Sequence, residues 1–278
     1  DYGLAPCIQE AIDNACDHCK LGYIPEPWKQ RVAAACAGWQ RSHYGWDVDP
    51  SIIRVVPDVL EAYEIFLREL VGAGNSVIVP TPAYMPFLSV PKLYDVDVIE
   101  IEMLQSGDAE TGEAQWVFDF DAIERAFAAG CHAFVLCNPH NPIGKVLTLE
   151  EELRLSDLAA QYDVRIFNDE IHAPFVFEGR HIPFPTISEQ AALQSMTATS
   201  ASKSFNIPGT KCAQVLLTNP ADRDMWAVKA EWSEHQTATI GAIATTTAYN
   251  EGDLWFQDAF AYVCRNLALF DEQMRERF

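Results

Sequence analysis

The sequence predicts an α/β protein built around a mostly parallel β-sheet. Short apolar and β-branched runs alternate with longer helical patterns along the chain, as in strands connected by helices. In addition, several of the predicted strands are followed directly by clusters of polar residues. Ligands of open α/β sheets bind beyond the carboxyl ends of their strands, so these clusters indicate where a site lies.

Helices are predicted where apolar residues recur about every three to four positions. They cover residues 8–20, 26–43, 58–71, 120–129 and 148–162, and the chain also stops inside a helical pattern at 267–278. Gly22 and Pro25 separate the first two helices. Asp58 and Thr148 are suitable N-cap residues, and Glu151 is placed to complete a capping box with Thr148.

Strands are predicted where short apolar or β-branched runs are bounded by turn residues. They cover residues 52–56, 76–79, 96–102, 133–137, 164–167, 197–199 and 214–217. Residues 107–113 combine glycine with acidic residues, and we expect them to form a flexible loop. The sequence contains no internal repeat and no low-complexity tract.

The bulk composition excludes several classes of protein. The chain has 278 residues, of which 49% are hydrophobic and 21% charged, as in a globular protein with one large domain. A formal net charge of −21 argues against nucleic-acid binding, because phosphates would be repelled. No apolar stretch approaches the roughly 20 residues of a membrane helix, and no secretory signal is visible. We therefore expect no nucleic-acid or membrane partner.

The eight cysteines do not have the spacing of a disulfide scaffold. Cys16 and Cys19 form a single Cys-x-x-Cys pair, whereas a zinc site needs a second pair of ligands. We expect no metal site, and ordinary reduced cysteines in a cytoplasmic protein.

The most informative stretch contains Lys203. It lies in the run SASKSFNIPG at residues 200–209, directly after a predicted strand. A lysine placed there can be dry enough to lose its proton, and a neutral amine can form a Schiff base with an aldehyde. The neighbouring hydroxyls and turn amides are suited to hold a phosphate.

Two upstream segments complete this pattern. The run NPHNPIGK follows the strand at 133–137, and the run VRIFNDEIH covers the strand at 164–167 and the polar residues after it. These runs place Asn141 and Asp169 at carboxyl ends of strands. We therefore expect both side chains to lie near Lys203 at one edge of the sheet.

These three segments, in this order, resemble the fold-type I pyridoxal-phosphate (PLP) enzymes, the aspartate aminotransferase superfamily. The runs NPHNPIGKV, NDEIH and SKSFNIPG look most like its C–S lyase branch, the MalY/PatB-type cystathionine β-lyases. The resemblance runs from about Asp1 to Phe278. It implies a three-layer α/β/α PLP-transferase-like large domain, with pyridoxal 5′-phosphate as the cofactor.

The resemblance also implies a role for each candidate residue. Lys203 would bind PLP covalently and move protons, and Asp169 would pair with the pyridine nitrogen. Asn141 would donate a hydrogen bond to the phenolic oxygen of the ring. His172 stands where many aminotransferases place a tyrosine near that oxygen, and Tyr84 would stack on the ring. Alternatives are a turn cap for Asp169, a structural role for His172 and core packing for Tyr84.

The phosphate would be bound by five residues from two parts of the chain. The backbone amides of Val59 and Leu60, at the start of a helix, match the donors of the family. Ser200 and Ser202 offer hydroxyl groups. Lys211 lies where aminotransferases commonly carry an arginine, and a lysine supplies the charge without the bidentate fork.

Tyr23 matches the tyrosine that reaches the phosphate of the partner subunit. The resemblance thus implies a homodimer with a shared active site, and a surface turn is the alternative for Tyr23. It further implies three parts: an N-terminal segment at 1–45 that contributes to the dimer interface, the PLP-binding large domain at 46–250, and at 251–278 the start of a helix leading to a small domain.

The resemblance implies further sequence before Asp1 and after Phe278, so the chain looks like a fragment that lacks most of the small domain. The arginine that pairs with the substrate carboxylate belongs to that C-terminal part in the family. We assign this role neither to Arg265 nor to Arg275. The chain is therefore expected to bind PLP and to catalyse poorly.

Three functions are consistent with the residues. The first is a C–S β-lyase that splits cystathionine or a similar L-cysteine S-conjugate into a thiol, pyruvate and ammonia. The second is an aminotransferase, which uses the same first steps and requires a 2-oxo acid. The third is a non-catalytic PLP-fold domain that binds a partner. Pyruvate release without a keto acid separates the first from the second, and a failure to bind PLP would favour the third.

Overall fold

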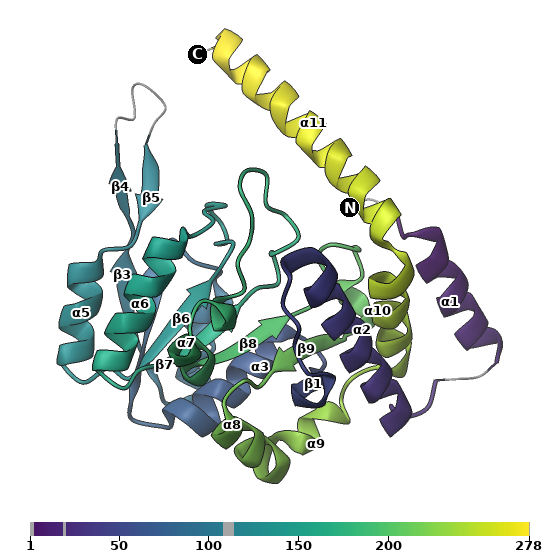
Figure 1. Ribbon diagram of the computed structural model, residues 1–278, viewed down its shortest axis with the longest axis horizontal. Coiled ribbons are helices and arrows are strands. Elements are labelled where there is room, and N and C mark those ends of the chain that lie inside the picture. Colours follow the sequence, from purple (N-terminus) through teal and green to yellow (C-terminus); the bar gives the residue numbers. More distant parts are fainter. Residues whose placement is uncertain (1–2, 19–20, 108–113, 278) are drawn as a thin grey trace.

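A computed structural model describes residues 3–18, 21–107 and 114–277 (Figure 1). Its centre is a seven-stranded sheet. In spatial order the strands are β1 (Ile53–Val56), β9 (Ala213–Leu216), β8 (Ser195–Thr199), β7 (Arg165–Asp169), β6 (Ala133–Cys137), β2 (Ser76–Thr81) and β3 (Asp97–Glu102). Strand β9 is antiparallel to both of its neighbours, and the remaining pairs are parallel. The predicted α/β class with a mostly parallel sheet is confirmed.

Both faces of the sheet are covered because the side chains of its strands alternate. Val135 and Phe167 belong to one buried cluster, together with Phe66 of helix α3 (Val59–Phe66). Their neighbours Phe134 and Ile166 belong to a second buried cluster that contains residues of other helices. Successive side chains of a strand point to opposite faces, so the two clusters are the two layers between sheet and helices. The fold is the expected three-layer α/β/α arrangement.

The remaining helices surround this sheet. They are α1 (Pro6–Asp17), α2 (Glu26–Tyr44), α4 (Pro86–Ser89), α5 (Phe120–Ala128), α6 (Leu149–Gln161), α7 (Glu189–Gln194), α8 (Pro220–Met225), α9 (Glu231–Glu234), α10 (Thr239–Glu251) and α11 (Asp253–Arg277). A small hairpin joins β4 (Leu104–Ser106) to β5 (Gln115–Val117). Figure 1 shows α11 continuing from α10 and extending away from the body of the molecule. Among the described residues, no helix is long and apolar enough to cross a membrane.

The predicted helix caps are confirmed in detail. Asp58 Oδ1 accepts a hydrogen bond from Glu61 N at 2.9 Å, at the start of α3. Thr148 and Glu151 form the reciprocal capping box of α6. The hairpin and the helices between β9 and α11 were not predicted, and α11 begins well before the helical pattern noted at 267–278. Residues 108–113 of the predicted loop, and residues 19, 20 and 278 of the predicted helices, lie outside the described part.

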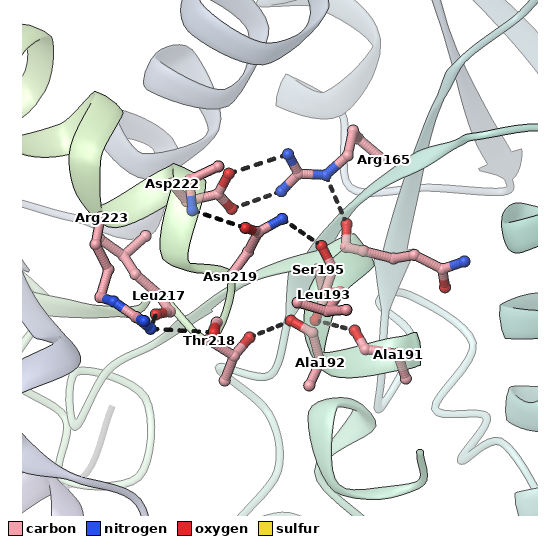
Figure 2. Close-up of polar contacts among 12 residues, drawn as sticks. Arg165, Ala191, Ala192, Leu193, Ser195, Leu217, Thr218, Asn219, Asp222 and Arg223 are labelled. Carbon is pink, nitrogen blue, oxygen red and sulfur yellow. Dashed lines mark hydrogen bonds and ion pairs between the residues drawn. The ribbon is translucent and has the colours of Figure 1, made fainter. Parts of the chain in front are cut away.

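A polar cluster holds α8 against the edge of the sheet that lies opposite the polar strand ends (Figure 2). Arg165, at the start of β7, donates to both carboxylate oxygens of Asp222 at 3.0 and 2.5 Å, and to the carbonyl oxygen of Gln194 at 3.0 Å. The Asp222 side chain is 1% exposed. Asn219 donates to the carbonyl oxygen of Leu193 at 2.6 Å. Because a bidentate pair orients both partners, the cluster fixes the connection that follows β9.

Glu152 is a carboxyl group buried on α6. Its side chain accepts a hydrogen bond from Asn138 Nδ2 at 2.7 Å, and the residue is 0% exposed. Burial, together with the nearby charge of Glu170, raises the pKa of Glu152 to about 8. In the unfolded chain Glu152 has the ordinary glutamate pKa of about 4.3. Folding stability therefore falls as the pH rises from about 4.3 to about 8, because the unfolded chain loses this proton first.

We expect Glu152→Gln to remove this loss of stability, because glutamine keeps the hydrogen-bond acceptor and carries no charge. The variant should melt about 5 °C higher than the original chain at pH 9 and at nearly the same temperature at pH 5. Glu150→Gln is the matched control, since Glu150 is exposed on the same helix. Thermal unfolding followed by circular dichroism checks this, and equal melting temperatures at pH 9 would contradict it.

Candidate active site

A cavity of about 200 Å³ opens at the edge where the carboxyl ends of the parallel strands meet. Its lining includes every predicted site residue except Tyr23: Val59, Leu60, Tyr84, Asn141, Asp169, His172, Ser200, Ser202, Lys203 and Lys211. These residues come from segments that are far apart in the sequence. The fold therefore brings Asn141, Asp169 and Lys203 together at one edge of the sheet, as their positions after strands predicted.

The topology explains this convergence. The segments after β1, β2, β6, β7 and β8 start at the same edge because these strands point the same way. Strand β9 runs in the opposite direction, so the residues that precede it lie at that edge too. Lys211 therefore enters the cavity from the amino end of a strand.

Asp169 is the last residue of β7 and is 5% exposed. Its Oδ1 accepts a hydrogen bond from Ile171 N at 3.0 Å. Burial raises the pKa of Asp169 to about 7, and the Ile171 bond and the charge of Lys203 partly offset this effect. A cation beside Asp169 would favour the ionised carboxylate, so the group is suited to pair with a protonated ring nitrogen.

Lys203 lies in a turn that hydrogen bonds and apolar packing hold in place. Ser200 Oγ donates to the carbonyl oxygen of Cys212 at 2.9 Å and accepts from Ser202 N at 3.1 Å. Phe205 is fully buried next to the turn. The proton of the Ser200 hydroxyl is thus engaged in shaping the turn, whereas Ser202 contributes to the cavity lining.

The Asn141 loop and the Tyr84 loop are tied to each other. His140 Nε2 donates to the carbonyl oxygen of Pro82 at 2.9 Å, and His140 N donates to that of Lys145 at 2.7 Å. Burial lowers the pKa of His140, so its ring is neutral and keeps the proton on Nε2. This contact links the loop that carries Asn141 to the one that carries Tyr84.

Two ring side chains border the cavity. Tyr84 is 39% exposed, and its ring contacts Phe87 edge to face, with centroids 5.6 Å apart. Burial and the charge of Lys203 lower the pKa of His172 to about 4. His172 is therefore a neutral hydrogen-bonding group at physiological pH.

The end of the cavity beside α3 combines the amide groups of Val59 and Leu60 with Lys211. Lys211 Nζ donates to Asp58 Oδ2 at 2.7 Å. A helix N-terminus and an ammonium group together suit an anion.

Tyr23 lies outside this cavity. It is 91% exposed and borders a separate surface depression with Leu21, Gln236 and Thr237. The position of Tyr23 is open to a partner subunit, and its role there stays a prediction.

Several residues that line the cavity were not predicted from the sequence. These are Pro57, Asp58, Phe87, Cys137, Ile171, Pro208 and Cys212. Cys137 ends the predicted strand at 133–137 and Ile171 lies within the run VRIFNDEIH, so strand-end position alone was a sufficient signal for both. Phe87 lies on α4, and no local pattern marked it. Among the described residues, no cluster of His, Cys, Asp and Glu could hold a metal ion.

Comparison with known proteins identifies the family. The sequence profile described as aminotransferase class I and II matches residues 8–276. The chain belongs to this family. It is also 35% identical over 259 residues to "Cystathionine beta-lyase" of Corynebacterium glutamicum, a match that covers 93% of this chain and 67% of that protein.

Two further relatives support the match. "Protein MalY" of Escherichia coli is 30% identical over 285 residues, covering 100% of this chain and 70% of that protein. The crystal structure of a putative PLP-dependent β-cystathionase from Corynebacterium diphtheriae superposes with a TM-score of 0.87 at 34% identity, covering 96% of this chain and 67% of that one. The predicted family and its C–S lyase branch are confirmed, and the chain spans about two thirds of the length of these relatives.

The chemistry of the donor set fits the PLP cofactor of this family. Asp169 is a buried carboxylate in the cavity lining and would suit a ring nitrogen that needs an anionic partner. The amine of Lys203 would suit the aldehyde, and the α3 N-terminus with Lys211 offers donors that would suit the phosphate. Each polar part of PLP thus has a chemically matched group in one cavity.

Proposed function

We propose that this chain carries the active site of a PLP-dependent C–S β-lyase that acts on cystathionine or a similar L-cysteine S-conjugate. The observation that carries the proposal is the convergence of Lys203, Asp169 and Asn141 in one cavity. The similarity to relatives named cystathionine beta-lyase supports the reaction class.

Bound PLP supplies an electron sink for the pair of electrons released when a bond at the substrate Cα is broken. Lys203 would hold the cofactor through its amine and would accept the substrate Cα proton as a general base. Asp169 would keep the proton on the ring nitrogen, because an ionised carboxylate favours a positive charge beside it. Asn141 would donate to the phenolic oxygen, and Tyr84 would cover one face of the ring.

The remaining residues bind and orient. The amides of Val59 and Leu60, the hydroxyl of Ser202 and the ammonium group of Lys211 would hold the phosphate, whereas the Ser200 hydroxyl donates to the Cys212 carbonyl. Neutral His172 lines the same cavity as Asp169 and Lys203 and would hydrogen-bond near the phenolic oxygen. In the overall reaction the Cβ–S bond breaks, the thiolate takes up a proton, and one water converts the remaining fragment into pyruvate and ammonia.

An aminotransferase is the second candidate, because its first proton transfer requires the same three residues and the family includes such enzymes. The two functions differ in where the Cα proton is delivered. A lyase needs no acceptor, whereas an aminotransferase needs a 2-oxo acid.

We also propose that the protein is a cytoplasmic homodimer in which Tyr23 reaches the phosphate site of the partner subunit. The exposed position of Tyr23 supports this assignment. The cysteines of the described part are unpaired, as in a reducing compartment.

A product assay distinguishes the functions. The purified protein is incubated with PLP and L-cystathionine in the absence of a keto acid, and pyruvate and homocysteine are quantified. We expect equal amounts of both products. Turnover that appears only after addition of a 2-oxo acid would instead establish the aminotransferase, and failure to bind PLP would exclude both.

A further inference from the structure

The anion-binding end of the cavity contains a carboxylate as well as cationic and N–H donors. Asp58 lines the cavity at the start of α3, where its Oδ1 caps the helix by accepting from Glu61 N at 2.9 Å. Its other oxygen, Oδ2, accepts from Lys211 Nζ at 2.7 Å. The ammonium group assigned to the phosphate is therefore already paired with an anion of the protein.

The backbone at Lys211 is held independently of this ion pair. Lys211 has a φ of +55°, a left-handed conformation in which glycine is favoured over residues with a side chain. Ala238 N donates to the Lys211 carbonyl oxygen at 3.2 Å. A Cβ at Gly241 of α10 would come within 2.1 Å of the Thr210 carbonyl oxygen, so α10 packs directly against this segment. The flexible lysine side chain can thus change partners without movement of its backbone.

The ion pair itself is only partly shielded from solvent. The side chains of Lys211 and Asp58 are 56% and 39% exposed. Exposed pairs of this kind contribute little to stability, so Lys211 can leave Asp58 at low cost. A phosphate at the α3 N-terminus would then lie in the same cavity as the released carboxylate, and the two anions would repel each other.

We propose that Asp58 competes with the phosphate of PLP for Lys211 and thereby limits the affinity of this chain for its cofactor. The inference rests on the proposed PLP site and adds a residue that sets cofactor affinity. Binding of PLP exchanges the partner of Lys211 from Asp58 to the phosphate. The carboxylate remains at the helix cap as an opposing charge.

Asp58→Asn tests this directly, because asparagine is an equally good N-cap and carries no charge. We expect the dissociation constant of PLP, measured by titration of intrinsic fluorescence, to fall about tenfold. The affinity for pyridoxal, which lacks the phosphate, should not change. Asp119→Asn is the matched control. Asp119 caps α5 in the same way, by accepting a hydrogen bond from Ala122 N at 2.9 Å, and it lies outside the cavity lining.

A double-mutant cycle with Lys211→Met separates competition from positioning. If Asp58 competes for Lys211, then Lys211→Met weakens PLP binding more in the Asp58→Asn protein than in the original chain. If Asp58 instead orients Lys211 toward the phosphate, the loss is smaller in that background and PLP binds Asp58→Asn more weakly.

Three results would overturn the inference. They are a smaller loss of PLP affinity from Lys211→Met in the Asp58→Asn protein, weaker PLP binding by Asp58→Asn, and unchanged PLP affinity in a folded Asp58→Asn protein. These readouts involve no turnover. A failure of the cofactor-affinity proposal can therefore be distinguished from a failure of the lyase proposal, because the latter would appear as absence of pyruvate release. Absence of PLP binding in every variant would refute the cofactor site itself.

Discussion

Replacing Lys203 with alanine is expected to abolish covalent retention of PLP and to lower lyase turnover by at least about 10³-fold. The amine both holds the cofactor and accepts the Cα proton in the proposed mechanism, and no other lysine except Lys211 lines the described cavity. Loss of both tasks from one substitution gives the largest effect predicted for this protein.

The measurement is intact mass after reduction of the PLP complex with borohydride, which fixes an imine as a stable amine. The original chain should gain the mass of a phosphopyridoxyl group, and Lys203→Ala should not. Lys92→Ala, at an exposed position outside the cavity lining, should behave like the original chain. A labelled Lys203→Ala protein would show that another amine is the reactive one.

Asp169→Asn is expected to lower turnover by about 10²- to 10³-fold while the protein remains folded. Asparagine keeps the acceptor for the Ile171 amide, so the end of β7 should retain its shape. It cannot, however, balance a positive charge on the ring nitrogen, and the cofactor then withdraws electrons less strongly.

Turnover and the melting temperature of the PLP complex should be measured together with Asp163→Asn, an acidic residue outside the cavity lining, as the control. A merely structural role for Asp169 predicts a lower melting temperature with nearly unchanged turnover. Equal activity of Asp169→Asn and the original chain would remove Asp169 from the proposed mechanism.

Much of the fold and candidate site was predictable because the relevant signals are local. The apolar run of β6 and the hydroxyl and acidic groups that cap α6 lie within a few residues of one another. Lys203, Asn141 and Asp169 each follow or end such a strand. The position of a residue at a strand end can therefore be inferred from its immediate neighbours alone.

Contacts between distant segments could not be inferred in this way. The carboxylate of Asp58 was predicted as a helix cap, and its second contact joins residues 153 positions apart. The hydroxyl of Ser200 was assigned to the phosphate, whereas the structure shows it bonded to the Cys212 carbonyl. Both differences depend on β9 lying beside β8 and β1.

By itself, the sequence determined the α/β class, the order of most strands and helices along the chain, and the residues at the strand ends. Only the tertiary structure decided that β9 runs antiparallel, which places Lys211 at the same edge as Lys203 and opposite Asp58. The physical reason is that alternation of apolar residues identifies a strand but carries no information on its direction. Direction and pairing are set by burial of side chains from segments far apart in the sequence.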